Sequence, residues 1–118
     1  MQDFRELKVW QKSHALTLAV YRLTSTMSRA ELFGLTSQMR RAASSIGANI
    51  AEGCGRDGGA DLARFLQIAA GSASELENHA LLARDLGYVA RDADEMLIVG
   101  TAEVKRMLHG LIETVRRS

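Results

Sequence analysis

The chain has 118 residues, no proline and one cysteine, and 47% of its residues are apolar although only three Phe, two Tyr and one Trp are present. This length supports one hydrophobic core. An aliphatic core without alternating strand patterns is typical of packed helices, and a single cysteine excludes an internal disulfide and a cysteine-rich metal site. We therefore expect one all-α domain over residues 1–118, with no cofactor.

Charge is distributed unevenly along the chain, although the net charge is only +1. Residues 1–56 hold eight basic and four acidic side chains, and the remainder holds seven basic and ten acidic ones. Twelve of the fifteen basic residues are Arg, which suits phosphate recognition and partly buried ion pairs. The same bias also fits ordinary helix propensity. No secretory segment or long apolar run is visible, so we expect a soluble, cytoplasmic protein.

Apolar residues recur at spacings of three and four in four segments. They predict helices over residues 5–27, 36–53, 60–86 and 92–116. Thr36 is expected to cap the second helix and Gly87 to close the third. The glycine-rich loop 53–59 follows no strand and lacks the Walker lysine, so it does not predict a nucleotide site. Short connections favour an antiparallel up-and-down four-helix bundle.

Apolar residues on the first and fourth helices cover wider faces than one bundle core requires. On the first helix, two neighbouring stripes consist of Leu7, Trp10, His14, Leu18 and Tyr21, and of Val9, Leu16, Val20, Leu23 and Met27. The surplus predicts a homo-oligomer. We expect Trp10 and Tyr21 to pack in the core or in an interface rather than to stack on bases.

The segment 33–56 combines small residues with a regularly spaced polar series. We expect its polar side chains to satisfy one another's hydrogen bonds, with help from a glutamate of the third helix; the residues are Ser45, Asn49, Glu52 and Glu75. No nucleophile with a matched base accompanies them, so the pattern does not predict catalysis.

Arg40 and Arg41 in this segment are the best candidates for phosphate contact, because a guanidinium can donate to two phosphate oxygens and an oligomer would repeat each arginine. Consecutive residues lie about 100° apart on a helix, so at most one of the two is expected to face a given partner. The alternative is that Arg41 pairs with Glu52 or Glu75, within or between bundles.

Further nucleic-acid candidates are Arg56 and a basic strip on the first helix, formed by Arg5, Lys8, Lys12 and Arg22. The three histidines lack the spacing of a helical metal site, so no metal is predicted. Cys54 lies among glycines and is expected to be exposed but inert.

A set of motifs resembles the four-helix bundle family first identified as proteins encoded in 23S rRNA intervening sequences. The residues are Phe4, Leu7, Trp10, Lys12, Phe33–Leu35, Gln38–Ile46, Asn49–Gly53, Phe65, Ala69, Ser72, Glu75 and Leu86–Tyr88. The resemblance implies an up-and-down bundle assembled as a ring-like homopentamer, without established catalytic activity. The related accessory variability proteins of diversity-generating retroelements imply nucleic-acid binding. Gly47 departs from the family, which commonly has Pro there, so a proline-imposed bend is not expected.

We accordingly expect a non-enzymatic, homo-oligomeric bundle, pentameric by resemblance, that binds RNA or DNA weakly through repeated arginines. The alternative is a scaffold that recruits a partner protein without touching nucleic acid. The near-neutral total charge favours this alternative, because it is low for a dedicated nucleic-acid binder.

Overall fold

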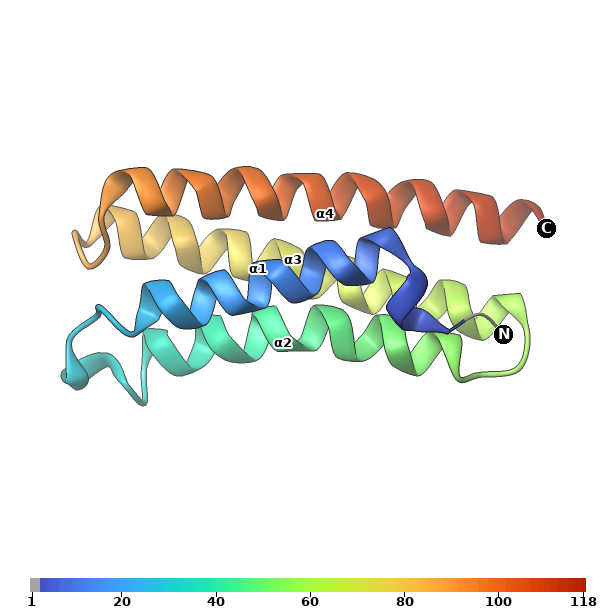
Figure 1. Ribbon diagram of the computed structural model, residues 1–118, viewed down its shortest axis with the longest axis horizontal. Coiled ribbons are helices and arrows are strands. Elements are labelled where there is room, and N and C mark those ends of the chain that lie inside the picture. Colours follow the sequence, from blue (N-terminus) through green and yellow to red (C-terminus); the bar gives the residue numbers. More distant parts are fainter. Residues whose placement is uncertain (1–2) are drawn as a thin grey trace.

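The computed structural model describes residues 3–118, and all regular elements within this range are helical (Figure 1). The elements are the 3₁₀ turns η1 (Phe4–Glu6) and η2 (Arg29–Glu31) and the helices α1 (Lys8–Thr24), α2 (Leu35–Cys54), α3 (Gly59–Asp85) and α4 (Arg91–Arg117). Each helix packs against the next, and α1 closes against α4. The expected all-α, up-and-down four-helix bundle is thus confirmed, with dimensions of 45 × 22 × 20 Å.

Aliphatic side chains and alanines fill the bundle core, as the composition predicted. The largest fully buried hydrophobic side chains are Val20, Met39, Ile46, Ile50, Leu66, Leu76, Val104 and Leu108. Alanines of α3 are buried between them and allow the neighbouring helices to approach closely. Among the helices of residues 3–118, none has the length and apolarity needed to cross a membrane.

The first helix is shorter at both ends than the predicted range 5–27. Asp3 accepts a hydrogen bond from the backbone N–H of Arg5 at 3.0 Å and thereby caps η1. Leu7 is then extended, with φ −75° and ψ 127°, so α1 begins only at Lys8. At the other end the backbone continues as tight turns, because Met27 N–H donates to the carbonyl of Thr24.

Thr36 does not cap the second helix, contrary to the prediction. α2 begins at Leu35, whose N–H donates to Oε1 of Glu31 at 3.4 Å. Thr36 is buried, and its hydroxyl donates to Sδ of Met27 at 3.8 Å. The other oxygen of Glu31 accepts a hydrogen bond from the Tyr88 hydroxyl at 3.2 Å. Glu31 therefore connects the start of α2 with the turn between α3 and α4.

Gly87 closes the third helix, as the sequence predicted. Its φ of 73° lies in the left-handed region that favours glycine. The N–H of Tyr88 donates to the carbonyl of Ala83, and the N–H of Gly87 donates to that of Arg84, both at 3.0 Å. This is a Schellman motif, which satisfies carbonyls at the helix end. In Figure 1 this turn lies at the same end of the bundle as the connection between α1 and α2.

Candidate nucleic-acid interface

Helices α1 and α2 and the connection between them border an open groove of about 410 Å³, here called the arginine groove. Its lining residues are Tyr21, Leu32, Phe33, Thr36, Ser37, Arg40, Arg41 and Ser44. The lining therefore combines two guanidinium groups, two aromatic rings and several hydroxyls, and it contains no carboxylate. Such a surface carries positive charge and can accommodate an anionic ligand.

Arg40 is half-buried and held in place from two sides. Its Nε donates to Oγ1 of Thr24 at 2.9 Å, and its guanidinium carbon lies 4.7 Å from the centroid of the Tyr21 ring. The Thr24 hydroxyl in turn donates to the carbonyl of Val20 at 2.7 Å. Within residues 3–118 no acceptor engages the two terminal nitrogens of Arg40. These nitrogens are therefore positioned to donate to an external phosphate.

Arg41 is exposed, and its side chain has no carboxylate within 4.0 Å in the described part of the chain. The alternative pairing with Glu52 or Glu75 is not made inside the bundle, where Glu52 pairs with Arg56 and Glu75 with His79. Arg40 and Arg41 both line the groove. The expectation that only one would serve a given surface is therefore not met, since long side chains reach across the 100° between consecutive positions.

Arg56 lies near the opposite end of α2, roughly 20 Å along the helix from the arginine groove. Its Nε donates to Oε2 of Glu52 at 3.1 Å, and its guanidinium carbon lies 5.0 Å from the Phe65 ring centroid. Arg64 approaches the same ring at 4.6 Å and also has a carboxylate partner. Arg56 therefore belongs to a separate, charge-neutralised cluster and not to the groove.

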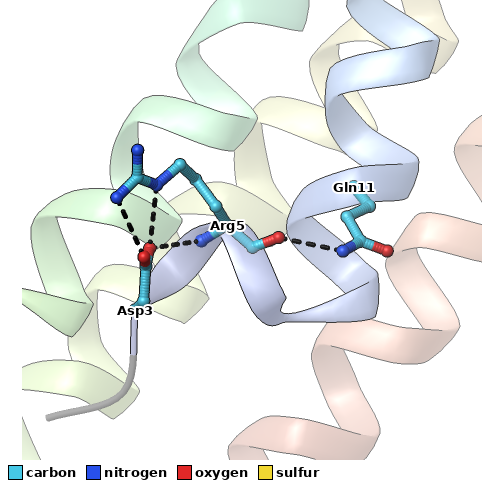
Figure 2. Close-up of polar contacts among 3 residues, drawn as sticks. All are labelled: Asp3, Arg5 and Gln11. Atoms are coloured by element: carbon cyan, nitrogen blue, oxygen red, sulfur yellow. Dashed lines mark hydrogen bonds and ion pairs between the residues drawn. The ribbon is translucent and has the colours of Figure 1, made fainter.

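Arg5 does not extend a basic strip on α1, because it lies in the turn that precedes the helix. Figure 2 shows its guanidinium on the Asp3 carboxylate, with Nε and Nη2 at 3.1 and 2.9 Å from the two oxygens. Gln11 Nε2 donates to the Arg5 carbonyl at 2.9 Å and joins this turn to α1. The hydrogen bond from Arg5 lowers the pKa of Asp3. The charge of Arg5 is thus balanced within the turn.

The rest of the predicted strip is also divided. Lys12 forms an ion pair with Glu103 of α4 at 3.3 Å. Lys8 and Arg22 are exposed, but Arg22 lines a different groove, between α1 and α4. Neither residue is therefore part of the arginine groove.

Part of the expected polar series joins α2 to α3. Nδ2 of Asn49 lies 2.8 Å from the Ser45 carbonyl and 3.0 Å from its Oγ, and Ser45 Oγ lies 2.9 Å from Oγ of Ser72. Glu52 and Glu75 do not contribute, contrary to the prediction, because both are exposed and bond to the residue four positions further along the chain, Arg56 and His79 respectively.

A glutamate does cross to another helix, but it is Glu77 rather than Glu75. Its Oε1 lies 3.1 Å from Nζ of Lys105 in α4, and both side chains are less than one-third exposed. Glu75 instead faces His79 one turn along α3, at 3.4 Å. This ion pair serves the α3–α4 contact and lies outside the arginine groove.

Cys54 is buried, so the expectation that it is exposed is wrong. It ends α2 and packs into the core, and burial raises the pKa of its thiol. No cluster of metal-ligating side chains occurs among the described residues. His14 instead stacks on Trp10, with ring centroids 4.8 Å apart.

Two aromatic residues of the groove were not predicted as functional. Tyr21 is 45% exposed and supports Arg40, instead of packing in the core of the chain. Phe33 is 92% exposed. The available signal for Phe33 was its position between the predicted helices 5–27 and 36–53, where no apolar helix face accounts for an aromatic side chain. Trp10 behaves as expected of a packing residue, because a Cβ at Gly47 would lie only 3.3 Å from its Nε1.

Comparisons with known proteins agree with this architecture. Residues 5–110 match the family described as 23S rRNA-intervening sequence protein. A protein of unknown function from the S23 ribosomal protein family of Bacteroides thetaiotaomicron VPI-5482 has a similar crystal structure, with a TM-score of 0.79 and 27% identity over 88% of this chain and 97% of that chain. A comparison with curated proteins found no match. The family match covers most of the chain, which therefore belongs to the 23S rRNA-intervening sequence protein family.

Proposed function

We propose that the chain is a non-enzymatic, homo-oligomeric bundle that binds RNA or DNA weakly through the arginine groove. The observation that supports this proposal most is the pairing of Arg40 and Arg41 in one groove that has no carboxylate in its lining. Most of the other arginines, such as Arg56, form an ion pair with an acidic side chain. Guanidinium groups without such a partner are available for phosphate oxygens.

The fixed position of Arg40 strengthens the proposal. A free arginine loses side-chain entropy when it binds a ligand. Arg40 has already lost much of this freedom, because Thr24 and Tyr21 hold its guanidinium from the side and from one face. Its terminal nitrogens can therefore bind a phosphate at a smaller entropic cost.

Repetition of the groove in an oligomer compensates for weak binding by each copy. One chain has a net charge of only +1 and two arginines in the groove, so a single groove gives low affinity. Linked copies raise the effective concentration for a second contact on the same strand. The family resemblance implies a ring-like homopentamer, which would present five grooves.

A salt titration tests this function. Fluorescence anisotropy of a labelled, unstructured oligonucleotide measures affinity for the wild type, for Arg40→Gln/Arg41→Gln, and for the control Arg116→Gln/Arg117→Gln. The control removes the same charge from consecutive exposed arginines at the end of α4. We expect wild-type affinity to fall steeply with salt, and the slope of log K against log salt to decrease by about 0.7 for each lost single-strand phosphate contact.

Only the groove variant should show the reduced slope. No binding by the wild type at low salt would contradict the proposed function. Equal effects of the two double variants would show that the charge matters but the groove does not.

A second candidate, recruitment of a partner protein, is favoured by the net charge of only +1, which is low for a dedicated nucleic-acid binder. A pull-down from nuclease-treated lysate separates the two candidates. A protein that remains bound after nuclease treatment supports recruitment, and one that is lost with the nucleic acid contradicts it.

A further inference from the structure

Phe33 has the most exposed large hydrophobic side chain among the described residues, and it lies beside the two arginines of the groove. From this we infer that the arginine groove binds unpaired nucleic acid, with Phe33 stacking on a base while Arg40 and Arg41 hold neighbouring phosphates. This inference rests on the proposed function and adds the structural class of the ligand.

Packing within the chain does not explain Phe33. At 92% exposure its ring is almost entirely in water, whereas Leu32 beside it is 39% exposed. An exposed Phe contributes nothing to the bundle core and leaves apolar surface in contact with solvent. Tyr21 and Leu32 are also exposed and line the same groove, so Phe33 is part of an apolar patch of the kind that marks a ligand site.

The backbone around Phe33 is held in a defined conformation. η2 precedes it, and the N–H of Gly34 donates to the carbonyl of Glu31 at 3.0 Å. The Glu31 carboxylate in turn contacts Leu35 and Tyr88. These bonds fix the connection to both α2 and the α3–α4 turn. The ring therefore projects from an ordered turn, which lowers the entropic cost of stacking.

The two aromatic rings of the groove differ in whether a face of the ring is covered. One face of the Tyr21 ring is covered by the Arg40 guanidinium, 4.7 Å from its centroid. Among the described residues no such contact covers Phe33, so its ring offers an open face to a base. A groove of about 410 Å³ is of the size that small ligands occupy. A cationic groove beside an aromatic platform is the arrangement by which proteins hold single strands.

This arrangement favours single strands over duplexes. In a duplex each base is already stacked and paired, so a surface ring can reach it only after unstacking, which costs a few kcal/mol. An unpaired base carries no such cost. Stacking also uses the π-face that all bases share, so we expect little dependence on base sequence.

Binding of four labelled probes tests the inference: one unstructured RNA and one unstructured DNA strand, each alone and annealed to its complement. The variants are Phe33→Ala, the conservative Phe33→Tyr, and the control Leu86→Ala. Leu86 is 51% exposed and lies outside the groove, in the turn between α3 and α4. Light scattering reports the oligomer mass of each variant.

Phe33→Ala should weaken single-strand binding about 5- to 150-fold, the range for loss of one base stack. Duplex affinity and the salt slope should not change, and Phe33→Tyr and Leu86→Ala should bind like the wild type. A larger effect on RNA or on DNA identifies the natural strand.

Three results would overturn the inference. They are an unchanged single-strand affinity for Phe33→Ala, an equal loss for single strands and duplexes, and a change in oligomer mass, which would make Phe33 a subunit contact. In each case salt-dependent binding by the wild type would leave the proposed function intact. If the wild type binds none of the four probes, both fail.

Discussion

At the scale of single residues, Asp94 has the least favourable environment for its charge. It is fully buried in the first turn of α4, and within residues 3–118 neither carboxylate oxygen has a hydrogen-bond partner. Burial raises the pKa of this carboxyl, and the nearby Arg84 opposes the shift only in part. The carboxylates of Asp85 and Glu95 reinforce it. Keeping the ionised form buried therefore reduces the stability of the bundle.

Replacing Asp94 by Asn should stabilise the protein at neutral pH by about 1–2 kcal/mol, because an unsatisfied buried group costs more when it is charged. The native carboxyl has the higher pKa, so the native state binds more protons and wild-type stability falls as pH rises from the ordinary value of 3.8 through the raised one. Urea unfolding at several pH values measures the difference, which should shrink toward acidic pH.

The control for this prediction is Asp92→Asn in the same turn. Asp92 is exposed, and its charge interacts favourably with the helix dipole, so its loss should destabilise by about 0.3–1 kcal/mol. A destabilising Asp94→Asn would contradict this account, because it would mean that the buried carboxylate is satisfied within the bundle.

The sequence indicated which arginines matter, but it did not predict which residues contact them. The sequence singled out Arg40 and Arg41, but Thr24 and Tyr21, which orient Arg40, come from another helix, and helical spacing carries no information about that contact. Asp94 is different. It continues the buried series Leu97, Thr101, Val104 and Leu108 at spacings of three and four, so its burial was visible in the pattern.

At the scale of the elements, a glycine allows the close contact between α2 and α3. A Cβ at Gly53 would lie 3.0 Å from both Cδ1 of Leu62 and Cβ of Phe65. These atoms belong to α3, and the Phe65 Cβ cannot move without its backbone. Gly53 therefore permits an interhelical distance that any side chain would increase.

Gly53→Ala should destabilise the protein by about 1–3 kcal/mol through overpacking. Gly71, in the middle of α3, is the matched control, because a Cβ there would meet no atom within 4 Å. Gly71→Ala should instead stabilise by about 0.5–1 kcal/mol, since Ala has the higher helix propensity. Thermal unfolding by circular dichroism measures both. Equal shifts in the same direction would contradict this account of the α2–α3 contact.

Helix interiors were predictable and helix ends were not. Apolar periodicity placed all four helices, because each must bury one face. The ends depend on local hydrogen bonds, and the predicted cap Thr36 failed because Glu31, five residues earlier, takes this role. The prediction that Gly87 closes α3 was correct, because it depended only on the backbone conformation of that residue.

At the scale of the whole molecule, we expect assembly through the α1–α4 side of the bundle. A groove of about 340 Å³ lies there, lined by Arg22 and otherwise by uncharged, mainly apolar residues that include Met96. Val99 is exposed nearby on the same helix. This side of α1 differs from the side that borders the arginine groove, so assembly would leave that groove accessible.

The assembled protein should have about five times the mass of one 12.9 kDa chain, as the family resemblance implies. Met96→Lys/Val99→Lys should shift this mass toward the monomer, because charged side chains disfavour a desolvated apolar contact. Light scattering coupled to gel filtration measures both. The control Glu113→Lys, at an exposed position far along α4, should not change the mass. A monomeric wild type would contradict the expectation.

The most direct test of the central claim is to map where nucleic acid lies on the protein. A single strand that carries photoreactive thiouridine is crosslinked to the wild-type protein, and mass spectrometry identifies the modified residues. We expect adducts at Phe33 and Tyr21 and on the neighbouring turns of α2, and we expect Arg40→Gln/Arg41→Gln to abolish them. Adducts confined to the cluster of Arg56 and Arg64, or to the end of α4, would contradict it.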